Sequence, residues 1–248
     1  MLPTVKPRYV WVFLAINLVV FGVLTLAGGS ENPVVLIVFG ANFAPAVKAG
    51  EYWRLLTANF IHIGVVHLLL NTYALYIIGQ EVETLYGHAR FVVIYLLSGV
   101  SGAVASYWLT HGLSAGASTA LFGSFGALGV FFYRNRHLLG EISHQQLLRM
   151  GLLLVINLLI GILPGSRIDN WGHLGGLVGG AFLGWLLCPR YRRTDPFLLA
   201  FQSALRRPPE LANEYFTDTN SLLRQLPFVL AFVAVLFGLV WLRDYLFN

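Results

Sequence analysis

The sequence predicts an all-α membrane protein, a polytopic bundle of transmembrane helices with seven spans. Of the 248 residues, 57% are hydrophobic and only 11% are charged, whereas a soluble domain carries about 25% charged residues. The apolar residues are gathered in seven stretches. As a helix each stretch would be roughly 24 to 29 Å long, which is close to the ~30 Å hydrocarbon core of a bilayer.

These stretches share an apolar and almost uncharged composition; they are Tyr9–Ala27, Gly64–Gln80, Phe91–Leu109, Ser118–Tyr133, Leu147–Leu163, Trp171–Cys188 and Leu226–Leu242. The first follows Lys6 and Arg8 and could be mistaken for a signal peptide. Its apolar run is longer than the ~7–15 residues of such a peptide, and no A-x-A-like cleavage site follows it. We therefore expect the first stretch to be retained as a span.

The basic residues predict how the chain is oriented. With a cytoplasmic N-terminus, 12 of the 16 Lys and Arg residues fall in inner segments and 4 in outer segments, as the positive-inside rule requires. The net charge of +5 therefore gives no reason to expect a nucleic acid partner. We expect a multi-pass protein of the cell membrane. The second, fourth and sixth stretches then all begin at the extracytoplasmic face.

Two long segments lie outside the predicted spans. Residues 28–63, on the outer side, are rich in apolar residues, so we expect them to pack on the bundle or to lie in the membrane interface. Residues 189–225, on the inner side, contain four prolines and several charges. This composition predicts a polar linker, with some amphipathic helix around Phe197–Leu205.

Small residues predict which helices meet. The sixth stretch has a glycine at every fourth position, namely Gly172, Gly176, Gly180 and Gly184. Such small-xxx-small stripes let helix backbones approach closely in lipid. The fourth stretch has small residues of its own, which are Ala120, Gly123, Ser124, Gly126 and Ala127. We therefore expect the fourth helix to pack on the sixth, which would bring Ser118 and His173 to the same depth.

Ser118 and His173 are the candidate catalytic pair. Polar groups inside a membrane are costly and usually functional. Ser118 begins the fourth stretch and His173 lies near the start of the sixth, so a serine nucleophile and a histidine base could meet there. The alternative for Ser118 is a helix N-cap that satisfies free N–H groups.

His67 and Asn71 are candidates for stabilising an oxyanion. They lie four residues apart in the second stretch and so share one helix face. Their N–H groups could donate to a developing negative charge, together with the backbone N–H of Ser118. The alternative is a hydrogen-bonded pair that holds helices together, and both roles could apply at once.

The remaining polar residues predict no further catalytic group. Asp169 lies four residues before His173, but we favour a helix N-cap there and therefore a dyad without a carboxylate. We expect His62 to be a packed loop residue, and the other histidines to be solvated loop side chains; these are His88, His111, His137 and His144. No H-E-x-x-H pattern occurs and no aspartate falls within a stretch, which argues against zincin-like and paired-aspartate proteases. We expect no metal and no cofactor.

Five motifs between Gly40 and Cys188 occur in the order known from one family. They are Gly50-Glu51-Tyr52-Trp53-Arg54, His67-Leu68-Leu69-Leu70-Asn71, Glu81-Val82-Glu83 followed by Leu85-Tyr86-Gly87, Gly116-Ala117-Ser118, and Asp169-Asn170-Trp171-Gly172-His173-Leu174-Gly175-Gly176. With these motifs the chain resembles the rhomboid family of intramembrane serine proteases. One departure is Thr119, where glycine is most usual after the serine.

The resemblance implies a catalytic core of six transmembrane helices in residues 1–189, a cytoplasmic linker in residues 190–225 and an additional transmembrane helix in residues 226–248. The roles that it implies are Ser118 and His173 as the catalytic dyad, His67 and Asn71 at the oxyanion, Gly116 in the nucleophile motif, Phe122 under the catalytic histidine, and Trp53 and Arg54 as structural residues. The active site would open to the extracytoplasmic side.

The resemblance also implies transmembrane proteins as substrates, cut in or near their membrane segments. Two other classes of function remain open. An inactive rhomboid-like protein would bind membrane clients without cutting them, although the intact Ser118 and His173 pair argues against this. A small-solute transporter would need polar sites at the midplane and usually inverted repeats, and the sequence contains neither.

Overall fold

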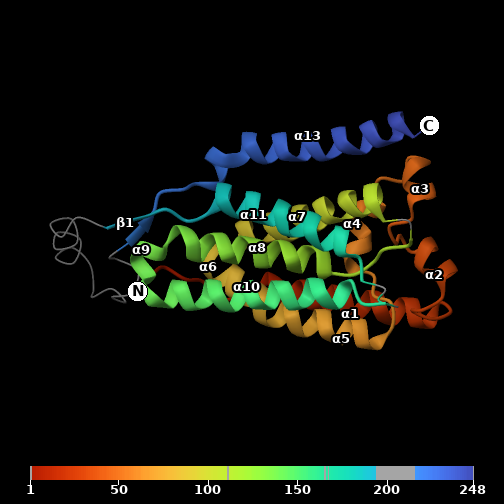
Figure 1. The fold of residues 1–248 in the computed structure, drawn as a ribbon, viewed down its shortest axis with the longest axis horizontal. Coiled ribbons are helices and arrows are strands. Elements are labelled where there is room, and N and C mark those ends of the chain that lie inside the picture. Colours follow the sequence, from red (N-terminus) through yellow and green to blue (C-terminus); the bar gives the residue numbers. More distant parts are fainter. Residues whose placement is uncertain (1, 111, 165, 167, 194–215, 248) are drawn as a thin grey trace.

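The computed structural model describes residues 2–110, 112–164, 166, 168–193 and 216–247, and this part of the chain is mainly a bundle of helices (Figure 1). A helix lies at each of the seven predicted stretches. These helices are α1 (Tyr9–Leu26), the continuous run α5 (Val65–Ala74), η2 (Leu75–Gly79) and α6 (Gln80–Tyr86), then α7 (His88–Leu109), α8 (Ser118–Arg134), α10 (Glu141–Gly161), α11 (Asn170–Leu187) and α13 (Leu222–Leu246).

Several of these helices can cross a membrane. Among the described residues, four are long and apolar enough to do so: α1, α7, α10 and α13. A fifth candidate is the broken pair Arg54–Phe60 and Val65–Tyr86, which bends by 92°. The prediction of a mainly helical bundle is thus confirmed, and the chain is a multi-pass membrane protein.

Several helices are longer than the apolar stretches that predicted them. The second helix runs on from Gln80 to Tyr86, α10 begins at Glu141 instead of Leu147, and α13 extends its stretch at both ends. Apolar composition reports only the part of a helix that suits lipid, whereas backbone hydrogen bonding continues through polar residues. Glycines with positive φ set the true ends, at Gly87 (φ +85°) after α6 and Gly140 (φ +54°) before α10.

The two ends of the predicted linker that the structure describes pair with each other, which the sequence analysis did not predict. Strand β1 (Tyr191–Arg193) pairs antiparallel with β2 (Phe216–Asp218). Asn220 then donates to the carbonyls of Leu186 and Cys188, both at 2.9 Å, which ties the end of the connector to the end of α11. The amphipathic helix predicted at Phe197–Leu205 lies outside the described residues.

Helix α8 lies at the centre of the bundle, with α7 and α11 packed closely against it (Figure 1). The glycine stripe explains how close the approach to α11 is. A Cβ atom added at Gly176 would lie 2.1 Å from the carbonyl oxygen of Thr119, and one at Gly180 would lie 2.0 Å from that of Gly123. The predicted packing of the fourth helix on the sixth is therefore confirmed.

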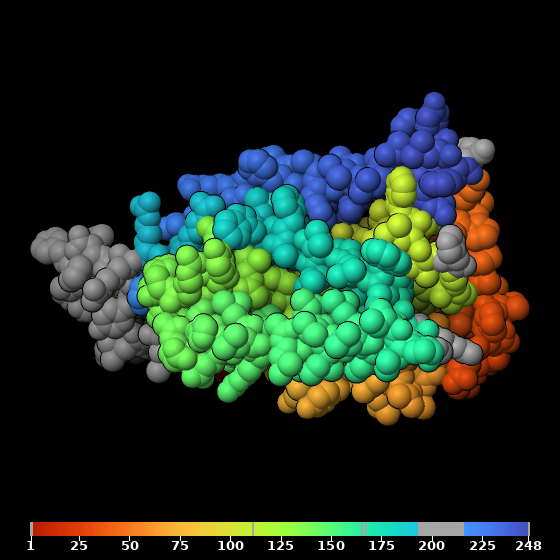
Figure 2. Space-filling model, viewed as in Figure 1, coloured from red at the N-terminus to blue at the C-terminus, as the bar shows by residue number. Residues whose placement is uncertain are grey.

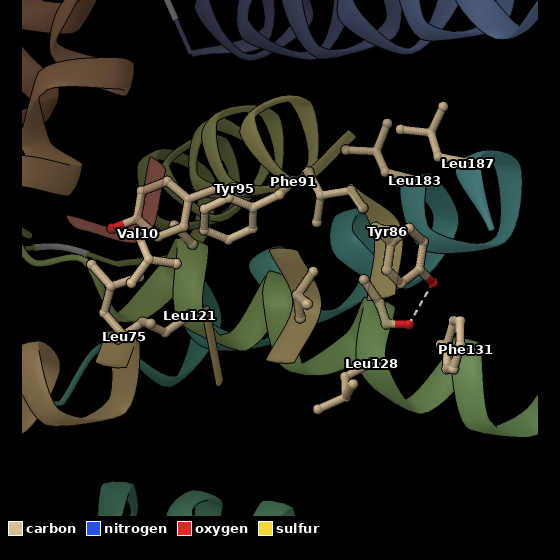
Figure 3. Close-up of a cluster of buried hydrophobic side chains, with 14 of the residues drawn as sticks. Val10, Leu75, Tyr86, Phe91, Tyr95, Leu121, Leu128, Phe131, Leu183 and Leu187 are labelled. Atoms are coloured by element: carbon tan, nitrogen blue, oxygen red, sulfur yellow. Dashed lines mark hydrogen bonds between the residues drawn. The ribbon is translucent and has the colours of Figure 1, made fainter. Parts of the chain in front are cut away.

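A hydrophobic cluster fills the space between the helices of the bundle (Figure 3). Tyr86 of α6 is buried in this cluster, and its hydroxyl donates to the carbonyl of Ala127 at 2.7 Å, with that of Gly184 at 3.2 Å. One side chain therefore joins α6, α8 and α11. Tyr95 and Phe91 of α7 add large rings to the same cluster.

Helix α10 is the outermost layer on one face of the molecule, where it lies over α8 (Figure 2). Many of its apolar side chains are exposed; Leu148 and Leu152, for example, are each 62% exposed. In a membrane protein such a surface faces lipid. Within the bundle, α8 is the main packing partner of α10.

The outer segment of residues 28–63 folds against the bundle, as predicted. It contains the short helices α2 (Pro33–Val38), α3 (Ala44–Lys48), α4 (Arg54–Thr57) and η1 (Ala58–Phe60). Val47 and Leu55 of this segment are buried in a cluster with Tyr107 of α7. The burial of these side chains holds the segment at the end of the bundle where α5, α8 and α11 begin.

Candidate active site

Ser118 and His173 meet at the end of the bundle where α8 and α11 begin. Ser118 is the first residue of α8, and its Oγ lies 2.8 Å from Nε2 of His173, near the start of α11. The two helices run in the same direction, and the close glycine packing described above brings their first turns together. No side chain caps the start of α8, so the N-cap alternative for Ser118 has no support in the structure.

Phe122 fixes the plane of the His173 ring. The two rings stack with centroids 4.2 Å apart and an interplanar angle of 14°. Only 8% of His173 is exposed, and its Nδ1 has no hydrogen-bond partner among the described residues. With Nδ1 carrying the proton, Nε2 is free to accept a hydrogen bond from the Ser118 hydroxyl.

Asp169 does not reach His173 Nδ1. Its carboxylate instead accepts the N–H of Gly172 at 2.9 Å and the hydroxyls of Thr110 and Ser114, both at 2.7 Å. The predicted N-cap is confirmed. Burial alone would raise the pKa of Asp169, but these three groups and the Ser106 hydroxyl outweigh it and hold the pKa below its usual value. The carboxylate therefore stays charged and anchors the start of α11 to the loop before α8.

His67 lies against the nucleophile turn. A Cβ atom added at Gly116 would be 2.7 Å from His67 Nε2 and 3.7 Å from Ser118 Oγ, so only glycine lets the His67 ring pack this closely against the turn. Nδ1 of His67 accepts the N–H of Ile63 at 3.4 Å, which puts the ring proton on Nε2. That N–H therefore lies beside Gly116, close to Ser118.

Asn71 lies one turn further along α5 and is buried. Its side-chain amide donates to the carbonyl of His67 at 3.0 Å. One of its two amide hydrogens is used in this contact, and the second is left for another acceptor. The structure thus agrees with the i, i+4 pairing of His67 and Asn71 on one helix face.

Trp53 and Arg54 lie in the outer segment (residues 28–63) and contact other residues of the same segment. Arg54 is buried and donates to the Glu51 carboxylate, with contacts of 2.9 and 2.6 Å, and to the carbonyls of Ile37 and Ala41. Its guanidinium also lies 4.7 Å from the centre of the Trp53 ring. These contacts hold the loops of the outer segment together.

His62 was expected to be a packed loop residue, and it is fully buried. Sequence reasoning missed what it touches: its Nε2 accepts the N–H of Ala117 at 3.4 Å, and its ring meets that of His67 edge-on with centroids 5.4 Å apart. Burial, followed by the neighbouring His67, lowers its pKa to about 4. Its position five residues before His67 was the only available signal.

The other histidines differ in part from the prediction of solvated loop residues. His88 begins α7, and its Nδ1 lies 2.6 Å from the buried carboxylate of Glu83. His137 and His144 are exposed, but they lie on α9 (Arg136–Leu139) and α10. A loop was predicted at each position because the polar ends of these helices lack an apolar pattern. His111 lies outside the described residues.

The fold and this polar cluster define a class of protein: a multi-pass helical membrane protein with a serine and a histidine in hydrogen-bond contact at one end of the bundle. Residues 49–190, more than half of the chain, match the model of the Rhomboid domain family. The chain belongs to the rhomboid family.

Several curated proteins are similar to the chain. It is 41% identical to Rhomboid protease GluP of Bacillus subtilis (strain 168) over 177 residues, which are 71% of this chain and 34% of that protein. It is 33% identical to Rhomboid-like protease 1 of Toxoplasma gondii over 188 residues, 71% of this chain and 63% of that one. RHOMBOID-like protein 4 of Arabidopsis thaliana is 37% identical over 152 residues, 61% of this chain and 38% of that protein. The chain thus spans between a third and just under two thirds of the length of these relatives.

Proposed function

We propose that the chain is an intramembrane serine protease that hydrolyses peptide bonds in or near the transmembrane segments of other proteins. The observation that carries the proposal is the 2.8 Å contact between Ser118 Oγ and His173 Nε2. That distance allows direct proton transfer from a serine to a histidine base. Two of the relatives described above are named as proteases, which supports the same activity.

The chemistry follows from the positions of the two side chains. His173 Nε2 takes the hydroxyl proton while Ser118 Oγ attacks the peptide carbonyl. The resulting imidazolium returns the proton to the leaving amine, which leaves an acyl-serine. A water molecule, deprotonated by the same nitrogen, then releases the new carboxyl group and regenerates Ser118. Phe122, stacked under the ring, holds the imidazole in place during both steps.

The negative charge of the tetrahedral intermediate needs hydrogen-bond donors. The Nε2–H of His67 lies beside Gly116, close to Ser118; Asn71 has a second amide hydrogen, and the backbone N–H of Ser118 lies in the first turn of α8. Removing one such donor typically lowers kcat by about 10²–10³-fold. The geometry supports this role best for His67, whose ring already lies at the turn.

In the membrane we propose seven spans, with a cytoplasmic N-terminus and an active site open to the extracytoplasmic side. The charge distribution, with 12 basic residues inside and 4 outside, supports this orientation. Residues 1–189 would form the catalytic core and α13 an added span. Substrates would be membrane-spanning helices that unwind easily at their outer ends, with a small residue at the cut.

The test is cleavage of a single-span substrate in detergent or liposomes by the wild-type protein and by Ser118→Ala and His173→Ala. Both variants should lose cleavage, and Ser118→Ala should also lose covalent labelling by a fluorophosphonate probe. Cleavage that persists in Ser118→Ala would contradict the mechanism. A folded wild-type protein that neither cleaves nor labels would instead indicate an inactive member of the family that binds membrane clients.

A further inference from the structure

The nucleophile turn is bound to one short segment of the outer loop. We use the name loop platform for residues 58–62, which include η1. Three hydrogen bonds join the two: Gly116 N–H to the carbonyl of Ala58 at 2.9 Å, Ala117 N–H to His62 Nε2 at 3.4 Å, and Thr119 Oγ1 to Asn59 Oδ1 at 2.6 Å. Ser118 lies between these contacts, and its hydroxyl is paired with His173.

The hydrogen bond between Asn59 and Thr119 is buried, and other hydrogen bonds hold the Asn59 side chain in place. Both residues are buried, 3% and 7% exposed. The amide nitrogen of Asn59 donates to the carbonyls of Leu55 and Leu56, at 3.1 and 3.0 Å. These two bonds fix the orientation of the amide, so that its oxygen faces Thr119. The Asn59 side chain therefore has a partner for each of its polar atoms.

Helix α7 leaves room for both members of the pair. A Cβ atom added at Gly99 would lie 2.5 Å from Asn59 Oδ1, and one added at Gly102 would lie 2.6 Å from Thr119 Cβ. Any larger residue at either position would displace the pair. Thr119 stands where glycine is usual after the nucleophile. The absence of side chains at Gly99 and Gly102 gives Thr119 and its partner Asn59 the space they occupy.

From this geometry we propose that Asn59 is a positioning residue for catalysis, which acts through the Thr119 hydroxyl to hold Ser118 at hydrogen-bond distance from His173. The proposal rests on the proposed function of the same site. Without the hydroxyl, the first turn of α8 keeps its two hydrogen bonds to the loop platform at Gly116 and Ala117, both of which precede Ser118. The residue that follows Ser118 then has only its packing against α7 and α11 to fix its position.

The experiment is a double-mutant cycle of Thr119→Val and Asn59→Leu, with kcat, KM, the fluorophosphonate labelling rate and the melting temperature measured for each protein. Each single variant should lower kcat and the labelling rate about tenfold, because a misplacement of 1 Å can lower a rate by ~10², and KM should change less than twofold. The double variant should be no slower than either single one.

Thr119→Ser, which retains the hydroxyl, should have nearly the wild-type rate. Should Thr119→Val fail to fold, Thr119→Ala has the same expected result.

Ser143→Ala is the matched control. Ser143 is fully buried on α10 and donates to the carbonyl of Phe132 at 2.7 Å, at the opposite end of the bundle. Its loss should lower the melting temperature without changing kcat. If Thr119→Val behaves in the same way, the pair is merely structural and the proposal is overturned, while the proposed function stands. If the wild-type protein neither cleaves nor labels, the proposed function itself has failed.

Discussion

Glu83 Oε2 accepts the backbone N–H of Val10 at 2.9 Å, although the two residues belong to different helices. Glu83 Oε1 accepts the N–H groups of Arg8 and Tyr9 at the same distance, and His88 Nδ1 lies 2.6 Å away. The free N–H groups of a helix start normally bind a side chain of their own segment or water. Here a buried carboxylate of α6 caps α1, so it fixes where the first helix joins the bundle.

Replacing Glu83 should therefore destabilise the protein strongly. Glu83→Ala leaves several N–H groups and His88 without their acceptor, so we expect a loss of about 3 kcal/mol or more, at about 1–3 kcal/mol for each buried unpaired group. Glu81→Ala is the matched control, because Glu81 lies on the same helix and makes no hydrogen bond or ion pair with the described residues. Unfolding in mixed micelles measures both. Equal stability of the two variants would contradict the capping role.

Asp169 offers a second prediction, which separates an anchor from a third member of a triad. In a Ser-His-Asp triad, Asp→Asn lowers kcat by about 10⁴. The oxygens of Asp169 bind Gly172, Thr110 and Ser114 instead of the His173 ring. We expect Asp169→Asn to lower kcat less than tenfold and to lower the melting temperature. A fall of several thousandfold at an unchanged melting temperature would show that Asp169 acts on the histidine.

Much of the bundle could be predicted because burial in lipid leaves a local mark on composition. The apolar stretches identified the helices, and the spacing of Gly176 and Gly180 indicated which pair would touch. Helix direction then placed Ser118 and His173 at the same depth, and they lie 2.8 Å apart. Each of these inferences needs only residues within one stretch and a rule for how stretches alternate.

The loop platform could not be predicted in the same way. Asn59 and Thr119 are 60 residues apart, and His62 reaches Ala117 only because the outer segment folds back over the start of α8. No periodic pattern records such a contact between two irregular segments. The strands Tyr191–Arg193 and Phe216–Asp218 were missed for a related reason, since three residues are too few to show an alternation.

The pH dependence of stability provides a test for His62. Its pKa in the folded protein is lowered to about 4 from the ordinary histidine value of 6.5, so between these two pH values the unfolded chain binds more protons than the folded one. The contribution of neutral His62 to the free energy of unfolding is therefore fully present above about pH 6.5. It is lost as the pH falls towards 4, by up to about 3 kcal/mol, since each unit of pKa shift corresponds to about 1.36 kcal/mol.

The measurement compares the unfolding of the wild-type protein with that of His62→Gln from pH 7 to pH 4. Glutamine keeps an acceptor for the Ala117 N–H and does not titrate. We expect the stability difference between the two proteins to shift in favour of the variant as the pH falls. A difference that stays constant over this range would show that His62 does not stay neutral in the folded protein.

The approach of α11 to α8 provides the last prediction. A Cβ atom at Gly180 would lie 2.0 Å from the carbonyl oxygen of Gly123 and 2.3 Å from its Cα. Backbone atoms cannot swing aside, so Gly180→Ala must push the two helices apart along their whole contact. We expect a loss of stability of about 2 kcal/mol, within the 1–3 kcal/mol range of overpacked cores, and a fall in cleavage because Ser118 and His173 separate.

Gly151→Ala in α10 is the matched control for Gly180→Ala. Nothing lies within 4 Å of a Cβ atom added at Gly151, so alanine there should be neutral or slightly stabilising. Melting temperature and cleavage rate measure both effects, and a Gly180→Ala variant as stable and active as Gly151→Ala would mean that the two helices are not in tight contact.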